Sequence, residues 1–469
     1  MIRPIKIFLY FVLTVSLIIL INKMLDKADV SLIPTPGMFT EDSPDTLITL
    51  EISPEEQIEP SDSIPAEDTI DKETLVPPDT LSRQKPGKTD SVLNAPPTFR
   101  ELYQGFIQRA QKSGQKNPPV RVLHIGDSQI EADRITSILR SHFQQSYGGK
   151  GPGLIMPYDP LRINATVRLT NQGKWDMAYS YRNHEYPGPA AFGFQGKAAW
   201  FRDEEAGFNI APRSGKKNRL NDFTKVRLLT TSPVGPFRLN VSANGSILSD
   251  TTLSKSDSLK INHFELPAPP SDMSFRFSGT TSPLIHGLTL DGKEGIAVDN
   301  IAMRGRPWPG FRLAGDNIIK STARHLNIGF IILQFGTNIL PTQTDDYGFY
   351  RVHFYRELKR IRELLPEVPI LVIGVQASAT LQEGDVVPMT HASLISAAQK
   401  SAVLAFDMGF FDLHKAMGGK EGAIHWADEG LMLTDYMHFS ARGARKTGDR
   451  IWTALQSLHQ HPPQNTESN

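Results

Sequence analysis

The chain has 469 residues, a length typical of about two to four domains. Its 50 basic and 50 acidic residues balance, so no overall positive charge suggests a nucleic-acid partner, and none is predicted. The absence of cysteine from the sequence excludes disulfides, thiolate metal sites, a cysteine nucleophile and a lipidated cysteine anchor. The composition therefore leaves open an enzyme with a non-thiol nucleophile or a binding protein.

An uncharged apolar run occupies residues 7–21, with two basic residues shortly before it and two shortly after it. The run is slightly shorter than the roughly 17–25 residues that span a bilayer as a helix, and it has no polar face. No small-x-small cleavage motif follows it. We therefore expect residues 1–27 to form an uncleaved signal-anchor rather than a removed signal peptide or a buried soluble helix. This predicts a protein anchored in the cell inner membrane by a single helix, with its catalytic part in the periplasm.

Residues 28–95 are rich in Pro, Ser, Thr, Asp and Glu. Within them, residues 36–91 contain 14 acidic and 4 basic side chains, which gives a local net charge of −10. Such a segment cannot bury enough apolar surface to offset the entropy of ordering it, and its proline content and like charges favour extended conformations. We interpret it as a disordered acidic tether between the membrane and a folded body.

Patterns typical of a globular α/β domain begin near residue 96. A β-rich run over residues 120–125 ends in the tetrapeptide Gly-Asp-Ser-Gln at 126–129, and apolar residues at helical spacing follow. A strand, a tight turn and a helix would place Ser128 at the carboxyl end of a strand, where open α/β sheets hold their sites. We assign residues 96–157 to the first part of this domain.

The segment from 158 to 298 has a different pattern. Short alternating runs recur between turn clusters and no helical pattern separates them, which is typical of a β-sandwich. We therefore predict a β-sandwich inserted into the α/β domain. The expected strands cover residues 165–169, 226–230, 237–241, 259–264, 273–277 and 284–290.

Residues 299–469 return to α/β patterning and are assigned to the second part of the domain. Nearly continuous apolar runs here suit central strands of a parallel sheet. The expected strands cover residues 296–303, 328–335 and 369–375, and the expected helices cover 347–365, 391–406 and the segment after Ser440.

Four short segments carry the residue types that acyl transfer needs: a nucleophile, a base, a carboxylate that orients the base, and donors for an oxyanion. Ser128 supplies a hydroxyl on a sharp turn, and His438 supplies an imidazole base. Asp435 could accept a hydrogen bond from one ring nitrogen of His438 and leave the other to take the Ser128 proton. Asn338 offers a side-chain amide to the oxyanion, together with the backbone N–H groups of Gly305 and Ser128.

Further residues were considered for binding. Gln129 and Trp308 lie beside the serine and the glycine in sequence and are expected to contact the substrate. His124 lies inside a strand and is expected to be a packed core residue, and no histidine has partners at metal-ligand spacing, so no metal site and no cofactor are predicted. Aromatic residues of the insert could stack on a sugar, although core packing is the expected role for most of them: Trp175, Tyr179, Tyr181, Tyr186, Trp200 and Phe201.

In order and spacing, the segments at 126–129, Gly305, Gly-Thr-Asn at 336–338 and Asp-x-x-His at 435–438 resemble the four sequence blocks of the SGNH (GDSL-like) hydrolase family. The resemblance implies a flavodoxin-like three-layer α/β/α domain and a serine esterase or, as in some members, an O-acyltransferase. The inserted region resembles the carbohydrate-binding-module-like inserts of membrane-anchored peptidoglycan and glycan O-acetylesterases in that family. This second likeness is one of architecture rather than of motif.

Carried over residue by residue, the resemblance implies Ser128 as the nucleophile, Asp435 and His438 as its partners, and Ser128, Gly305 and Asn338 as oxyanion donors. The function it implies is hydrolysis of O-acyl esters, with O-acetyl groups as the expected case, on an extracytoplasmic glycan such as peptidoglycan, through an acyl-enzyme. An O-acetyltransferase with the same triad remains an alternative, because serine chemistry alone does not distinguish water from a sugar hydroxyl as the acceptor. A non-catalytic glycan-binding protein is the third alternative.

Overall fold

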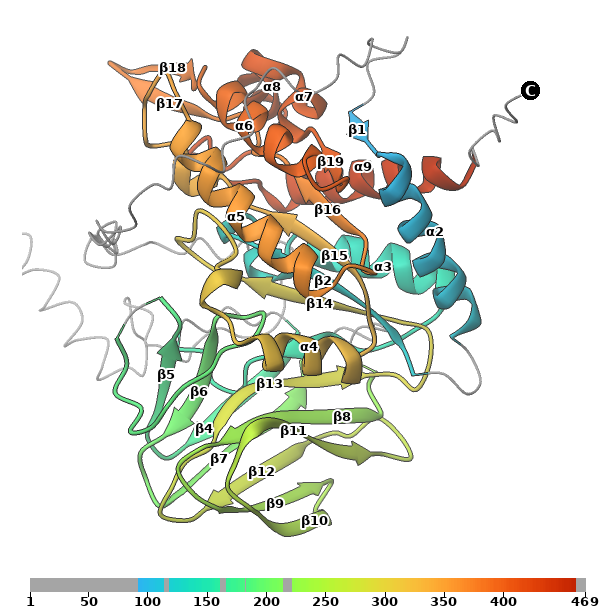
Figure 1. Cartoon of the computed structure of the whole chain (residues 1–469), viewed down its shortest axis with the longest axis vertical. Coiled ribbons are helices and arrows are strands. Elements are labelled where there is room, and N and C mark those ends of the chain that lie inside the picture. Colours follow the sequence, from blue (N-terminus) through green and yellow to red (C-terminus); the bar gives the residue numbers. More distant parts are fainter. Residues whose placement is uncertain (1–91, 114–117, 161–165, 182, 214–221, 461–469) are drawn as a thin grey trace, which may run out of the picture. The chain divides into compact units, whose positions relative to one another are not determined.

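The computed structural model describes residues between 92 and 460, apart from four short internal gaps (Figure 1). The predicted anchor, residues 1–27, and nearly all of the predicted tether, residues 28–95, lie outside the described residues. Among the helices that are described, none is long and apolar enough to cross a membrane. The described residues are 92–113, 118–160, 166–181, 183–213 and 222–460.

Five parallel strands form one sheet, and the short strand β1 (Leu93–Asn94) extends it antiparallel to β19. Numbered along the chain, the parallel strands lie in the order 2-1-3-4-5 across the sheet, which is an order of doubly wound α/β sheets. The expected mixed α/β class is therefore confirmed. In spatial order the strands are β14 (Ile296–Ala302), β2 (Val120–Gly126), β15 (Ile328–Gln334), β16 (Ile370–Ile373) and β19 (Gly409–Phe411).

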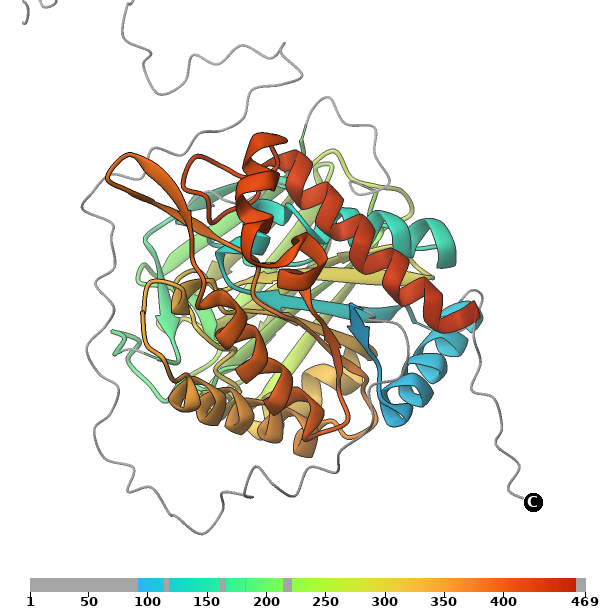
Figure 2. The ribbon, with the colours of Figure 1, turned by 90° about the horizontal axis from the view of Figure 1, so that it is seen from above.

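Helices cover both faces of this sheet (Figure 2). Because successive side chains of a strand point to opposite faces, Phe330 and Ile332 of β15 enter one hydrophobic core, and Ile331 and Leu333 enter the other. One core is closed by α2 (Pro97–Lys112), α3 (Thr136–Tyr147) and α9 (Ala441–Gln460), and the other by α4 (Asp316–His325), α5 (Gly348–Leu364) and α6 (Ala392–Leu404).

Short elements complete this part of the chain, and none of them was expected from the sequence. They are the helices α7 (Leu413–Met417) and α8 (Gly422–Asp428), the hairpin of β17 (Ala379–Gln382) with β18 (Asp385–Pro388), and the 3-10 turns η4 (Ser128–Asp133), η6 (Phe311–Leu313), η7 (Thr337–Ile339) and η8 (Gly419–Glu421).

Residues 153–291, here called the antiparallel region, form two further sheets, and we call the remaining described residues the α/β region (Figure 1). One sheet has the order β10-β9-β12-β7-β4, and the other has the order β11-β8-β13-β6-β5 with β3 added to β13. The strands are β3 (Gly153–Ile155), β4 (Val167–Gln172), β5 (Trp175–Tyr179), β6 (Lys197–Phe201), β7 (Glu205–Pro212), β8 (Lys225–Ser232), β9 (Phe237–Ala243), β10 (Ser246–Leu253), β11 (Ser256–Glu265), β12 (Met273–Ser278) and β13 (Leu284–Asp291).

The two antiparallel sheets share one hydrophobic core, to which Phe208 and Phe275 of one sheet and Leu228 and Leu288 of the other contribute. The ends of this region differ slightly from the predicted insert at 158–298. Strand β3 lies before the predicted start, and β14 of the parallel sheet begins before the predicted end.

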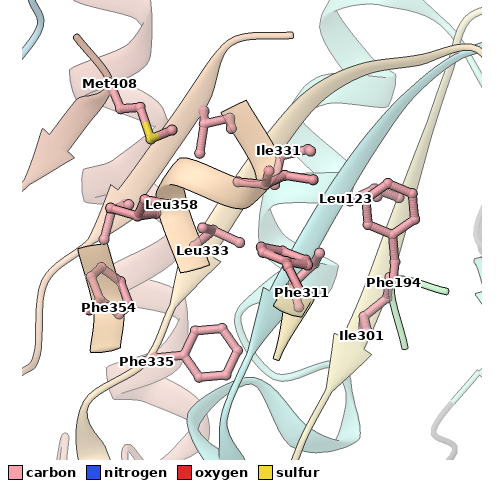
Figure 3. Close-up of a cluster of buried hydrophobic side chains, with 14 of the residues drawn as sticks. Leu123, Phe194, Ile301, Phe311, Ile331, Leu333, Phe335, Phe354, Leu358 and Met408 are labelled. Atoms are coloured by element: carbon pink, nitrogen blue, oxygen red, sulfur yellow. The ribbon is translucent and has the colours of Figure 1, made fainter. Parts of the chain in front are cut away.

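Figure 3 shows a contact between the two regions, in which Phe194 of the antiparallel region packs beside Phe311 in a core of the α/β region.

A buried ion cluster also joins the two regions. Arg121 on β2 pairs with Asp299 on β14 and, at 2.5 Å, with Asp291 on β13. Arg227 on β8 pairs with Asp291 at 2.8 Å, and the backbone N–H of Leu154 on β3 donates to Asp299 at 2.9 Å. Removing one partner of a buried pair leaves an uncompensated charge and costs about 3–5 kcal/mol. This cluster therefore couples the folding of the two regions.

Candidate active site

Three neighbouring parallel strands end at the same level of the sheet. Gly126 at the end of β2 pairs with Ala302 of β14 on one side and with Gln334 of β15 on the other. Because the strands are parallel and in register, the loops that follow them emerge side by side at the carboxyl edge. After β2, β14 and β15 respectively, these loops carry Ser128, Gly305 and Asn338.

The loop after β2 is fixed by a buried carboxylate. Asp127 Oδ1 accepts a hydrogen bond from the N–H of Gln129 at 3.0 Å and so caps η4, which begins at Ser128. Asp127 Oδ2 accepts from the N–H of Thr337 at 3.0 Å. Burial raises the pKa of Asp127, while both N–H donors act in the opposite direction. Asp127 therefore connects the serine turn to the loop that carries Asn338.

The end of η4 has an unusual backbone conformation. Ala132 and Asp133 follow one another with φ values of 52° and 64°, in the left-handed region that non-glycine residues rarely adopt. Such strain persists only where the surroundings hold it, and it is common at functional sites. Here the Asp133 carboxylate forms a two-point ion pair with the buried Arg140, whose Nε donates to the carbonyl of Val298 at 2.8 Å.

The serine hydroxyl, the imidazole and the carboxylate expected at the site lie in one hydrogen-bonded chain. Ser128 Oγ lies 2.8 Å from His438 Nε2, and His438 Nδ1 lies 2.6 Å from Asp435 Oδ2. Asp435 Oδ1 accepts from the backbone N–H groups of Met437 and His438 at 3.0 and 2.9 Å. Partial burial alone would raise the pKa of Asp435, but the hydrogen bonds from His438 and Met437 hold it below its usual range. Asp435 is therefore ionised and can orient the ring.

Two side chains of the serine turn hold the histidine loop in place. Gln129 is buried; its Nε2 donates to the Met437 carbonyl at 2.6 Å and its Oε1 accepts from the Phe439 N–H at 3.4 Å. Arg134 donates to the carbonyls of Ser128 at 2.5 Å and Phe439 at 3.3 Å. The residues on both sides of His438 are thus bonded to the serine turn. No sequence motif indicated this role, because it depends on backbone groups about 300 residues away.

Gln129 is only 1% exposed and both ends of its amide bind backbone groups, and the substrate contact expected for it stays a prediction. The substrate contact expected for Trp308 also stays a prediction. Its ring stacks on His353 of α5 with the ring centroids 4.8 Å apart, and it packs beside Tyr350. One face of the Trp308 ring is therefore used for packing on α5.

The expected oxyanion donors lie on adjacent loops. Gly305 is exposed, with φ 75°, and no atom lies within 4 Å of the position that a Cβ would occupy. Asn338 Nδ2 donates to the carbonyl of Arg306 at 3.0 Å, which joins the loop after β15 to the loop after β14. An amide nitrogen has two hydrogens, so one remains for a ligand.

The aromatic residues considered for sugar stacking separate into two groups. Core packing is confirmed for Trp175, Tyr186, Trp200 and Phe201, which are buried, and Tyr179 is partly buried against the same core as Trp175. Tyr181, in contrast, is 41% exposed. Within the described ranges, no three His, Asp or Glu side chains converge in a way that could hold a metal ion.

The chain was compared with protein families, curated proteins and solved structures. Neither a protein-family model nor a curated protein matches the sequence. The solved structure of a peptidoglycan O-acetylesterase, at 19% identity, aligns with 79% of this chain and 100% of its own, with a TM-score of 0.63. The chain shares that enzyme's fold. Because the α/β region makes up far less than 79% of the chain, the shared fold extends into the antiparallel region.

Two further solved structures align with lower TM-scores. A family two carbohydrate esterase from Clostridium thermocellum in complex with cellohexaose is 10% identical and covers 62% of this chain and 99% of its own, with a TM-score of 0.24. A GDSL-like lipase from Bacteroides thetaiotaomicron is 12% identical and covers 34% of this chain and 76% of its own, also with a TM-score of 0.24. At these TM-scores the two likenesses carry no argument.

Proposed function

We propose that the chain is a serine esterase of the SGNH type that hydrolyses O-acyl esters on a glycan, with O-acetyl esters as the first case. The observation that carries this proposal is the hydrogen-bonded chain from Ser128 Oγ through His438 to Asp435. The order of residue types matches what acyl transfer requires: a nucleophile, a base and a carboxylate that orients the base.

In the proposed mechanism, His438 Nε2 takes the Ser128 proton as Oγ attacks the acyl carbonyl carbon. The resulting imidazolium is stabilised by Asp435 and then gives its proton to the sugar oxygen, so the C–O bond breaks and the acyl group stays on Ser128. Water, deprotonated by His438, attacks this acyl-enzyme. The carboxylic acid leaves and the serine hydroxyl is restored.

The developing oxyanion would be bound by the N–H groups of Ser128 and Gly305 and by the amide of Asn338. Preorganised donors of this kind each contribute about 3–4 kcal/mol to lowering the barrier. The bond from Asn338 to the Arg306 carbonyl supports this assignment, because it orients the amide from a neighbouring loop before substrate arrives.

The proposal includes an architecture. The 2-1-3-4-5 strand order and the helices on both faces support a flavodoxin-like three-layer SGNH domain, and the shared core of the antiparallel sheets supports an inserted β-sandwich. The likeness to a peptidoglycan O-acetylesterase makes O-acetylated peptidoglycan the first glycan to test.

We further propose that residues 1–27 anchor the protein in the inner membrane and that residues 28–95 act as a tether that leaves the catalytic part in the periplasm. The uncharged run and the acidic, proline-rich segment support this. The full chain should resist extraction from membranes by alkaline carbonate, whereas a chain that starts at residue 28 should be extracted. Protease added to cells with a permeabilised outer membrane should degrade the catalytic part; its full protection would contradict the orientation.

The function is tested by acetate release from O-acetylated peptidoglycan and from a small acetyl ester. Ser128→Ala should lower turnover by roughly 10⁴- to 10⁶-fold, because no other group replaces the nucleophile. A fluorophosphonate should label the unaltered protein and not the variant. Labelling of neither would favour a non-catalytic binding protein.

Product analysis separates the two enzymatic alternatives. With an acetyl donor and an acceptor glycan both present, an esterase releases free acetate. An acetylated acceptor in place of acetate would favour the O-acetyltransferase alternative.

A further inference from the structure

Arg306 lies on the loop that follows β14, and its guanidinium has no ion-pair partner among the described residues. It follows Gly305 directly, and its carbonyl accepts the hydrogen bond from Asn338. Its backbone therefore belongs to the loop that carries the expected oxyanion donors. Among the described residues, none forms a hydrogen bond or an ion pair with the Arg306 guanidinium.

The antiparallel region holds this guanidinium in place. The Arg306 side chain lies over the ring of Tyr181, 4.4 Å from its centroid, just beyond the end of β5. Tyr181 is the exposed member of the aromatic set described above. A cation on an aromatic face is stabilised without any of its N–H donors being used. The donors of Arg306 thus remain available to a ligand.

The acidic group whose charge acts on Arg306 does not bond to it. Glu357 is buried on α5, where its Oε2 accepts from the backbone N–H of Arg312 at 3.2 Å. Burial raises the pKa of Glu357 to about 6. Glu357 is therefore bonded to the backbone of Arg312 rather than to the Arg306 guanidinium.

A second arginine of the molecule provides the contrast. Arg202 lies over Trp200 at 5.1 Å, in the same kind of contact as Arg306 with Tyr181. Its guanidinium, however, pairs with both Asp176 and Glu185. The protein therefore supplies carboxylates to the arginine that lies on Trp200 and supplies none to the arginine beside Gly305.

We propose that Arg306, held on Tyr181, determines specificity by binding a carboxylate of the substrate next to the ester that is cleaved. The inference rests on the proposed function, because it assigns a substrate class to that same site. The planar guanidinium offers parallel N–H donors to both oxygens of a carboxylate, which a lysine ammonium does not. The substrate class is a glycan with free carboxylates on its sugars or on attached peptides, in preference to a neutral polysaccharide.

The test compares an O-acetylated oligosaccharide that has a free carboxylate with the same compound after conversion of the carboxylate to a neutral amide. Acetate release gives kcat and KM for the unaltered chain, Arg306→Met, Arg306→Lys and the matched control Arg202→Met. The unaltered chain should prefer the free carboxylate by about 10- to 100-fold in kcat/KM, as expected for hydrogen bonds between charged groups. Arg306→Met should lose most of this preference, mainly through KM.

The other variants complete the pattern. Arg306→Lys should keep part of the preference, and Arg202→Met should keep all of it. No preference in the unaltered chain, or a full preference in Arg306→Met, would overturn this inference while acetate release still supports the esterase. Absence of serine-dependent acetate release from every ester would instead overturn the proposed function. If melting curves show that Arg306→Met is unfolded, the comparison of the unaltered chain with Arg306→Lys decides.

Discussion

The carboxyl edge of the parallel sheet and the space between the two antiparallel sheets bury different kinds of side chain. At the carboxyl edge of the parallel sheet, the buried polar side chains of Asp127 and Gln129 bond to backbone groups, including those of Thr337 and Met437 on neighbouring loops. Between the antiparallel sheets the core is aromatic, and Phe208 stacks on Phe275 with centroids 4.5 Å apart. A buried polar group is costly unless it is bonded, so such groups persist where they position something. Hydrogen bonds therefore fix the reactive groups, and apolar packing fixes the shape of the antiparallel region.

Asp435→Asn should give the largest effect on catalysis with little effect on stability. The amide cannot stabilise the imidazolium and favours the wrong ring tautomer, so kcat should fall by about 10³- to 10⁴-fold. Because 45% of the Asp435 side chain is exposed, the melting temperature should stay close to that of the unaltered chain. Steady-state kinetics with a small acetyl ester and thermal unfolding measure the two effects. An unchanged kcat would remove Asp435 from the proposed triad.

Phe275→Ala should show the opposite behaviour. Phe275 is completely buried, and the cavity left by its removal should lower the free energy of unfolding by about 3–5 kcal/mol. Urea denaturation measures this loss. At a temperature where the variant remains folded, kcat should match that of the unaltered chain. A fall in kcat comparable, as a free energy, to the loss in stability would show that packing between the antiparallel sheets also positions the reactive groups.

Gln129→Met tests the hydrogen bonds that hold the histidine loop. The substitution leaves the Phe439 N–H without a partner and the Met437 carbonyl with only the Gln376 amide, 3.2 Å away. This should cost about 1–3 kcal/mol, seen as a fall in kcat of about 10- to 100-fold with little change in KM. The matched control is Gln195→Met, since the buried Gln195 amide donates to the His286 carbonyl at 2.6 Å in the antiparallel region. The control should lose stability without losing kcat. Equal kinetic effects from both variants would contradict a positioning role for Gln129.

The smallest effects concern pH, and here the two regions should respond alike. Burial lowers the pKa of His124 on β2 to about 3 and that of His286 on β13 to about 4. Above pH 6.5 both are neutral in the folded and unfolded chains. As the pH falls below this value only the unfolded chain gains protons, so stability is lost.

For each of these histidines the loss at pH 4.5 should be on the order of 2 kcal/mol. His124→Gln and His286→Gln, measured by urea unfolding at pH 7 and pH 4.5, should each flatten the pH dependence of stability. An unchanged slope in either variant would contradict burial of that histidine in its neutral form.

Much of the fold could be predicted because its strong patterns are local. The apolar run at 328–335 matches β15, and the alternating run at 273–277 matches β12, within one residue at each end. Strands β6 and β7 were missed because small residues such as Ala198, Ala199 and Gly207 interrupt the alternation of their sequences. Tertiary contacts rather than local propensity stabilise such strands.

The candidate site also has a part that the sequence predicts and a part that it does not. Motif order predicted that Ser128, His438 and Asp435 would converge, and their side chains do form one hydrogen-bonded chain, while their catalytic role stays a prediction. The bonds of Gln129 and Arg134 could not be predicted. They depend on which carbonyl and N–H groups of the loop before α9 come within reach of the serine turn, and a sequence does not display these distances.

The buried charges around Arg121 limit how the protein can be divided. A fragment comprising only the antiparallel sheets would contain Asp291 and Arg227 without the guanidinium of Arg121 between the two aspartates. A hydrolase trimmed of those sheets would retain Arg121 and Asp299 with half of their partners removed. Neither fragment keeps all the partners of its buried charges. Shortening this protein to a minimal catalyst would first require replacing those ions with apolar side chains of similar volume.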